Sequence, residues 1–248
     1  MSDAVVLTGM VLSAVAAGEY DRRLVLLTRE RGKITAFARG ARRQGSALLA
    51  ASRPFAFGQF TVYEGRSAYT MQSAQIDHYF AEFGSDLEGM AYGCYFLELA
   101  GYFSRENVDG AQMLNLLYLS LKALQKPALP NPLVRRIYEL RTLVVQGEYP
   151  ETFQCPGCGK DLTEGQYIPE RDAVFCRGCL NGKIIGHDLS PAGLYAMQYI
   201  IGAPLEKLYT FTLKEDVFQQ VERAVQACLK RYVRQEFPSL TVLDAITT

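Results

Sequence analysis

Histidine is scarce in this sequence, and its scarcity limits the chemistry that the protein can perform. Only two histidines are present, His78 and His187, and they lie far apart along the chain. Histidine is the most frequent general acid or base in enzymes. The sequence also lacks the G-x-x-x-x-G-K-[ST], G-x-G-x-x-G, H-E-x-x-H and G-x-S-x-G motifs of nucleotide-binding and hydrolytic sites. We therefore expect no catalytic residues and interpret both histidines as ordinary surface or core residues.

The protein also has a formal net charge of zero at pH 7. The 26 Lys and Arg residues are balanced by 26 Asp and Glu residues, so no global field draws the protein toward polyanions. A role with nucleic acid must then depend on how charge is distributed. Residues 1–80 contain 10 Lys and Arg residues against 6 Asp and Glu residues, which makes this third of the chain the basic part.

Long hydrophobic runs are absent too. The longest uncharged run, residues 189–205, contains two prolines and two glycines and falls short of the ~20 apolar residues that a membrane span requires. The start of the chain resembles an export signal only superficially, because it lacks the Lys or Arg with which such signals begin. These observations predict a soluble, cytoplasmic protein.

The first 80 residues show short β-like runs separated by turn residues. Five strands are expected, at residues 4–17, 20–28, 32–40, 55–64 and 68–77. Five strands in a small basic unit favour a closed barrel of the OB-fold type, which leaves no exposed sheet edge. We therefore predict an OB-fold nucleic-acid-binding domain at residues 1–80.

The hydrophobic period becomes that of helices after Ser85. Helices are expected at 86–105, 110–126, 132–146, from Ser190-Pro191 onward, and at 214–234. Their start signals are Ser85 with Glu88, Asp109, Asn131-Pro132, Ser190-Pro191 and Thr212 with Glu215, and Gly147 is a stop signal. The predicted fold class is α+β multidomain, with a helical domain at 81–152 and 187–248 that encloses an insert at 153–186.

Paired cysteines mark the insert. Cys155 and Cys158, then 17 residues, then Cys176 and Cys179 form C-x2-C-x17-C-x2-C, a spacing typical of a four-cysteine zinc ribbon. Four sulfur ligands close a tetrahedral site, so the zinc ion is expected to be structural and not catalytic. Redox-active dithiols or two disulfides are the alternatives. The other two cysteines, Cys94 and Cys228, fall in apolar helix patterns and are expected to be buried hydrophobes.

Basic residues cluster in the predicted barrel, with ten cations against four acids between Glu19 and Arg66. Strand alternation places Lys33, Thr35, Phe37 and Arg39 on one face and Ile34, Ala36 and Ala38 on the other. Cations beside an aromatic ring are typical of single-strand binding surfaces, although they could also form a solvated barrel face over a core phenylalanine. The candidate DNA-binding residues are Arg22, Arg23, Arg29, Arg31, Lys33, Phe37, Arg39, Arg42 and Arg43. The glycine-bearing basic loop at 39–46 is expected to be flexible and to follow a DNA backbone without reading its sequence.

Several short motifs, in their order and spacing, resemble the RecO family of DNA repair and recombination mediators. They are Gly9-Met-Val-Leu12, Gly18-Glu-Tyr-Asp-Arg-Arg23 with Leu26-Leu-Thr-Arg29, Arg31-Gly-Lys33, Ala38-Arg-Gly-Ala-Arg42, Tyr138-Glu-Leu-Arg141, and Gly147 leading into Cys155-x-x-Cys158-Gly. The resemblance implies an OB-fold, a helical domain and a zinc ribbon. It also implies a non-enzymatic, nucleoid-associated bacterial protein in which Lys33, Arg39, Arg42 and Arg43 match the family's basic barrel residues.

The resemblance further implies a set of partners. RecO-like proteins bind single- and double-stranded DNA, anneal complementary strands, and with RecR help RecA replace single-strand binding protein (SSB) on gapped DNA. The helical domain is then expected to bind the acidic SSB tail. The sequence does not choose among the candidate cations Arg135, Arg136, Arg141, Lys230, Arg231 and Arg234, near aromatics such as Tyr138 and Tyr232. The alternative is a zinc-ribbon adaptor that acts only through protein contacts.

Overall fold

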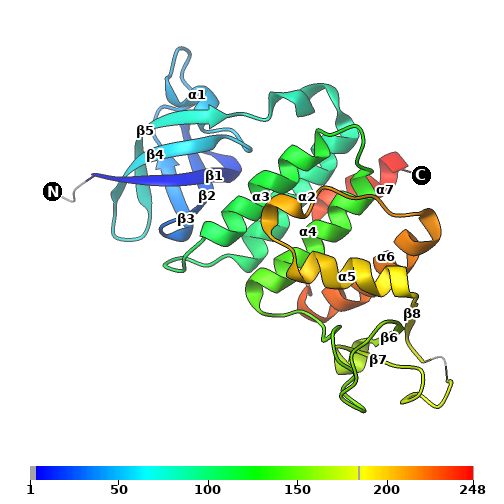
Figure 1. Cartoon of the computed structure of the whole chain (residues 1–248). Helices are drawn as coiled ribbons and strands as arrows, with labels where there is room; N and C mark the ends of the chain where they lie inside the picture. The colour runs from blue at the N-terminus through cyan, green and yellow to red at the C-terminus, as the bar shows by residue number, and fades with distance from the viewer. Residues whose placement is uncertain (1–3, 184, 248) are drawn as a thin grey trace. The chain divides into compact units, whose positions relative to one another are not determined.

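The computed structural model describes residues 4–183 and 185–247. The chain divides into two compact units, one of Met1–Leu121 with Phe237–Thr248 and one of Lys122–Glu236 (Figure 1). Residues 1–3, Ile184 and Thr248, which the predicted domains include, lie outside the described ranges. The domain boundaries expected from the sequence stay a prediction. No helix in the described ranges is both long enough and apolar enough to cross a membrane.

Five strands form a closed barrel in the first unit (Figure 1). They are β1 (Ala4–Ala17), β2 (Asp21–Thr28), β3 (Gly32–Ala38), β4 (Phe57–Glu64) and β5 (Tyr69–His78). The ring order is β1-β2-β3-β5-β4, in which β3 and β5 run parallel and the other neighbours run antiparallel. The predicted five-stranded, OB-like barrel is therefore confirmed.

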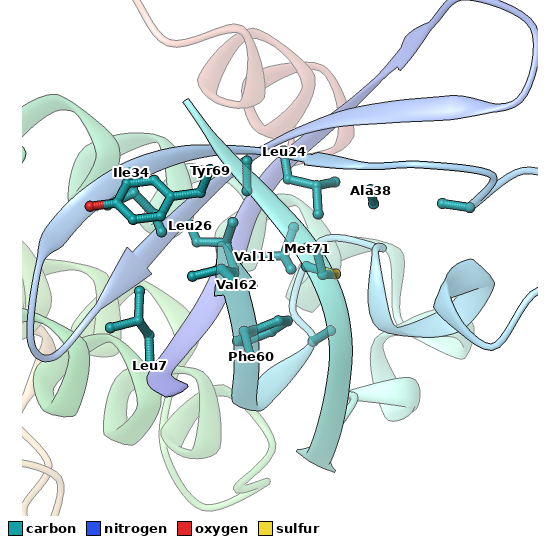
Figure 2. Close-up of a cluster of buried hydrophobic side chains, with 13 residues drawn as sticks. Leu7, Val11, Leu24, Leu26, Ile34, Ala38, Phe60, Val62, Tyr69 and Met71 are labelled. Carbon is teal, nitrogen blue, oxygen red and sulfur yellow. The ribbon is translucent and has the colours of Figure 1, made fainter. Parts of the chain in front are cut away.

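Strand alternation builds the barrel core. Along β3, Ile34, Ala36 and Ala38 are buried, whereas the residues between them are half-buried and point outward. Figure 2 shows Leu24, Phe60 and other apolar side chains of all five strands packed within the ring. The short helix α1 (Leu48–Ala51) lies within the connection between β3 and β4 and packs against β5.

The helices α2 (Leu87–Phe103) and α7 (Pro238–Thr247) pack together in the first unit, and α3 (Ala111–Leu124) also begins there. The predicted cap at Ser85 is wrong. Ser85 ends the 3-10 turn η1 (Ala81–Ser85), and Asp86 caps α2 instead by accepting a hydrogen bond of 2.9 Å from the Gly89 N–H. The expected cap at Asp109 does accept the Ala111 N–H at 2.8 Å.

Helix α7 was not expected from the sequence. Its first turn is held by Glu98 of α2, whose carboxylate accepts hydrogen bonds from the Ser239 backbone N–H and hydroxyl. Phe237 packs beside it with its ring 5.5 Å from that of Tyr95. The stabilising carboxylate lies 141 positions away, so the local sequence gives no sign of this cap.

The second unit contains α4 (Asn131–Gln146), α5 (Pro191–Gly202), the 3-10 turn η3 (Leu205–Lys207) and α6 (Glu215–Tyr232), and these three α-helices pack against one another. Ser190 caps α5 and Gly147 ends α4 in the left-handed region at φ 74°, as predicted. The predicted cap at Thr212 is wrong, because α6 begins at Glu215 behind Lys214 and no side chain caps it.

A small sheet lies between α4 and α5 in the sequence. It contains β6 (Gly165–Ile168), β7 (Ala173–Phe175) and β8 (His187–Leu189) in the order β7-β6-β8, and the 3-10 turn η2 (Pro169–Arg171) joins β6 to β7. The sequence predicts two short strands between the cysteine pairs, at 167–169 and 173–175, and β6 and β7 overlap them. Strand β8 is not predicted, because its three residues pair with β6 only after the chain has returned from the second cysteine pair.

Candidate metal centre and nucleic-acid interface

The four cysteines of the paired motif converge. The antiparallel pairing of β6 with β7 brings the turn at Cys155–Cys158 beside the turn at Cys176–Cys179, and all four Sγ atoms lie within 4.8 Å of one another. The Sγ atoms of Cys158 and Cys176 are 3.8 Å apart. In a tetrahedral zinc site each sulfur lies about 2.3 Å from the metal, which places two sulfur ligands roughly 3.8 Å apart. The Cys158–Cys176 distance therefore matches such a site. The donor set and its spacing therefore fit one metal ion such as zinc.

The thiols of the cluster affect one another's ionisation. Burial alone would raise the pKa of Cys155, but the N–H groups of Cys176 and Gly157 outweigh it and lower the pKa to about 6. Hydrogen bonding to the neighbouring thiols raises the pKa of Cys179 to about 12. The thiolate of Cys155 is thus favoured and that of Cys179 is disfavoured, unless a cation shares the site.

The alternative readings of the cysteine motif find less support. Two disulfides or two redox pairs would need each sulfur near only one partner, whereas all four sulfurs meet here. Cys94 and Cys228 lie outside the cluster on α2 and α6, and burial raises the pKa of both thiols. His187 lies outside it too, with its ring stacked on Tyr167, and the ring of His78 packs 4.2 Å from that of Phe80.

Asp172 fastens the ribbon to α6. It follows η2 with a left-handed backbone at φ 49°. Its carboxylate accepts hydrogen bonds from the hydroxyls of Tyr167 in β6 and Tyr232 in α6, and Arg231 Nε lies 3.7 Å from its Oδ1 atom. The Cys228 thiol also lies 3.7 Å from that oxygen. One carboxylate thus joins the four-cysteine ribbon to the last turns of a helix, a link that the local sequence does not reveal.

The basic residues expected to bind DNA fall into three groups on the barrel. Arg22 is the first group by itself, because it shares the inward face of β2 with Leu24 at one end of the barrel. Its Nη1 atom donates to the Leu49 carbonyl at 3.0 Å and to Ser52 Oγ at 2.8 Å. Burial, with the charges of Arg53 and Arg42, lowers the pKa of Arg22. This arginine holds α1 against the barrel.

The second group, Arg29, Arg31 and Lys33, lies at the β2–β3 turn. Residues 101–110 cover the outer face of the barrel there. The Lys33 backbone N–H donates to the Arg105 carbonyl at 3.0 Å. Gly32 has φ 62° and lies so close to Arg105 that a side chain at this position would place its Cβ 2.2 Å from the Arg105 carbonyl oxygen. The Arg31 carbonyl accepts from Asn107 at 2.9 Å, and that of Arg29 accepts from Gly110 at 2.9 Å. Only Arg29 of this group is fully exposed.

The third group surrounds the opposite end of the same face, which stays open. Arg23 on β2 and Phe37 on β3 are directly paired and both point outward, Arg23 exposed and Phe37 half-exposed. Arg39, Arg42 and Arg43 follow β3 and are exposed. We call this set, Arg23, Phe37, Arg39, Arg42 and Arg43, the open barrel face.

The basic loop after β3 carries turn hydrogen bonds and contacts the β1–β2 turn. Turn hydrogen bonds run from Arg43 N to the Gly40 carbonyl and from Ser46 N to the Arg43 carbonyl. The Gly40 N–H also donates to Asp21 Oδ1 at 2.7 Å, and the Arg42 N–H donates to the Tyr20 carbonyl at 2.8 Å. The loop is thereby fixed to the β1–β2 turn. Tyr20 was missed by the sequence reasoning, although an aromatic residue in a hairpin turn beside a basic motif was the available signal.

Most of the helical cations considered for an acidic peptide already have partners. Arg135 and Arg136 of α4 pair with the buried Glu139 at 2.8 and 2.7 Å, and Arg136 also pairs with Glu222 of α6 at 2.8 Å. Burial would raise the pKa of Glu139, but the two arginines outweigh it and hold the pKa below its usual value. Arg141 donates to the Ile200 carbonyl of α5 at 3.2 Å.

The cations at the end of α6 differ in their exposure and contacts. Arg231 contacts Asp172 and the Pro169 carbonyl. Lys230 and Arg234 are exposed, and within the described part of the chain neither forms an ion pair or a side-chain hydrogen bond. Tyr138 is fully buried and so offers no open ring to a ligand, whereas Tyr232 is half-buried and its hydroxyl donates to Asp172.

Comparison with known proteins identifies the family. The model for the N-terminal part of recombination protein O matches residues 1–80, and the model for its C-terminal part matches residues 84–241. DNA repair protein RecO of Acetivibrio thermocellus is 27% identical over 97% of this chain and 95% of its own length. The RecO protein of Desulforudis audaxviator is 31% identical over 94% of this chain and 94% of its own length. The RecO protein of Anaeromyxobacter dehalogenans is 31% identical over 98% of this chain and 97% of its own length. The chain therefore belongs to the RecO family of DNA repair proteins, which are recombination mediators and not enzymes.

Proposed function

We propose that this protein binds single- and double-stranded DNA through the open barrel face. The observation that carries the proposal is the direct pairing of outward-facing Arg23 with Phe37, with three further exposed arginines on the loop that follows. Arginines next to a partly exposed ring combine phosphate neutralisation with base stacking, which suits single strands of any sequence. Exposed arginines alone still contact the phosphates of a duplex.

The proposal is tested by the binding of a fluorescent single-stranded oligonucleotide across a salt series. The double variant Arg23→Glu with Arg39→Glu should lose most of the affinity, and the remaining binding should depend less steeply on salt. The double variant Lys126→Glu with Lys207→Glu is the matched control, because it makes the same change in net charge at two exposed lysines outside the barrel. An equal loss in both variants would show that only total charge matters and would contradict the proposal.

We propose that strand annealing and RecA loading follow from this surface together with protein partners. A mediator must hold DNA while SSB is displaced, so contacts with RecR and with the acidic SSB tail are expected to accompany DNA binding. Among the six helical cations considered for the acidic tail, Lys230 and Arg234 are exposed and form no ion pair or side-chain hydrogen bond within the described residues. We therefore favour the end of α6 as the place where the acidic tail binds.

Binding of a labelled peptide with the SSB tail sequence tests this assignment. Lys230→Glu with Arg234→Glu should abolish peptide binding and leave binding of naked DNA nearly unchanged. Arg29→Glu with Arg66→Glu changes the charge equally at two exposed barrel arginines and should leave peptide binding intact. Loss of peptide and DNA binding together in the α6 variant would contradict the assignment.

We propose that the four cysteines hold a single structural zinc ion. A closed set of four sulfurs leaves no position for water or substrate, so the ion stabilises the ribbon and takes no part in chemistry. The competing function, a zinc-ribbon adaptor that contacts only proteins, would show no salt-sensitive affinity for DNA. The oligonucleotide titration therefore also separates these two functions.

A further inference from the structure

Two segments of the barrel are joined at the open barrel face. The β1–β2 turn, residues 18–20, receives hydrogen bonds from Arg42, whose N–H donates to the Tyr20 carbonyl at 2.8 Å and whose Nη1 atom donates to the Gly18 carbonyl at 3.3 Å. Asp21 accepts the Gly40 N–H at 2.7 Å. These bonds hold the backbone on both sides of Tyr20 and so restrict the directions in which its ring can point.

The Tyr20 ring is stacked and still exposed. The guanidinium carbon of Arg43 lies 5.0 Å from the ring centroid, and 41% of the tyrosine is accessible to solvent. A cation over an aromatic ring at this distance is an attractive contact. It also orders two side chains, one aromatic and one positive, at the edge of a surface that already offers Arg23 and Phe37.

We propose that Tyr20 stacks on a nucleobase of single-stranded DNA while Arg43 neutralises an adjacent phosphate. The inference rests on the proposed DNA binding and names the residue that favours single strands over duplex. In an OB-fold, the loop between the first two strands borders the binding face of strands 2 and 3, which is where Tyr20 lies. Bases of a duplex are stacked on one another, so a protein ring gains contact only with an unpaired base.

The chain contains no tryptophan, which gives a direct test. Tyr20→Trp makes the only tryptophan, and its emission should be quenched when an oligothymidine binds. Tyr149→Trp is the matched control, because Tyr149 is 44% exposed and lies in the other unit. Its emission should not change. Binding of the oligonucleotide to Tyr20→Trp with unchanged emission would overturn the inference while leaving DNA binding by the barrel intact.

Affinity measurements supply the second test. Tyr20→Ser should weaken binding of single-stranded DNA roughly tenfold without changing the salt dependence, because stacking involves no counterion release. Tyr20→Phe should bind as tightly as the wild type, and neither substitution should change the affinity for duplex. Equal losses for single strands and duplex, or no loss for either, would overturn the inference. A wild type that binds no DNA would instead overturn the proposed function and the inference together.

Discussion

The ammonium group of Lys33 donates a hydrogen bond to the backbone carbonyl of Gly101, a residue 68 positions later in the chain. Gly101 lies in the last turn of α2, where carbonyl groups lack partners within the helix and the helix dipole favours a cation. Burial, together with the charge of Arg105, lowers the pKa of Lys33. The sequence predicts Lys33 as a DNA-binding residue, but its side chain joins β3 to the end of α2. A substitution of Lys33 should therefore be tested for its effect on stability as well as on DNA binding.

Lys33→Met should destabilise the protein by about 1 kcal/mol, because the Gly101 carbonyl loses a charged donor at a half-exposed position. Chemical denaturation of the wild type and the variant measures the difference. Arg39→Met is the control, since Arg39 directly follows β3 and is exposed, and it should leave stability nearly unchanged. If both variants were equally stable, the bond to Gly101 would have no energetic role.

Removal of the proposed zinc ion should unfold the ribbon and leave the barrel folded. Zinc binding by four cysteines contributes on the order of 10 kcal/mol to small zinc domains, so the ribbon sheet is not expected to persist without it. A chelator should release one zinc ion per chain, and hydrogen exchange should then increase in residues 153–189 while β1–β5 stay protected. Increased exchange throughout the barrel would show that the metal stabilises the whole chain.

Asp172→Asn should weaken the attachment of the ribbon to α6 without removing the metal. Asparagine tolerates the left-handed backbone at φ 49°, so the substitution removes the charge with little added strain. The partly buried pairing with Arg231 and two tyrosine hydroxyls suggests a loss of about 2 kcal/mol. Thermal unfolding measures it, and zinc content should stay at one ion. Asp188→Asn, at an exposed position of β8, should cause no such loss.

Glu139→Gln should destabilise the second unit by about 3 kcal/mol at neutral pH, because Arg135 and Arg136 lose a fully buried counter-charge. The arginines hold the pKa of Glu139 below its usual 4.5, so its contribution is complete above that value and is lost as the pH falls through the lower folded value. The stability difference between wild type and variant should therefore shrink below about pH 4.5. Glu148→Gln, at an exposed position, provides the comparison, and a difference that is constant with pH would contradict the assignment.

Local patterns determined much of this protein. The alternation of apolar residues predicted the five strands, since one face of each must be buried in the barrel. The spacing of Cys155, Cys158, Cys176 and Cys179 predicted their convergence, because two C-x-x-C turns joined by a hairpin have few other ways to arrange their thiols. Ser190 and Gly147 marked helix ends correctly, since both act on backbone groups only a few residues away.

Only the tertiary structure decided which charged residues are available. Lys33 and Arg22 share a basic segment with Arg23 and Arg39 in the sequence, yet the first two donate to Gly101 and Ser52 while the other two face solvent. A charge in the sequence specifies a side chain and not its partner, because the partner can come from any distance along the chain. The sequence determined the barrel, the helices α2 to α6 and the cysteine cluster, and long-range packing decided which arginines stay exposed.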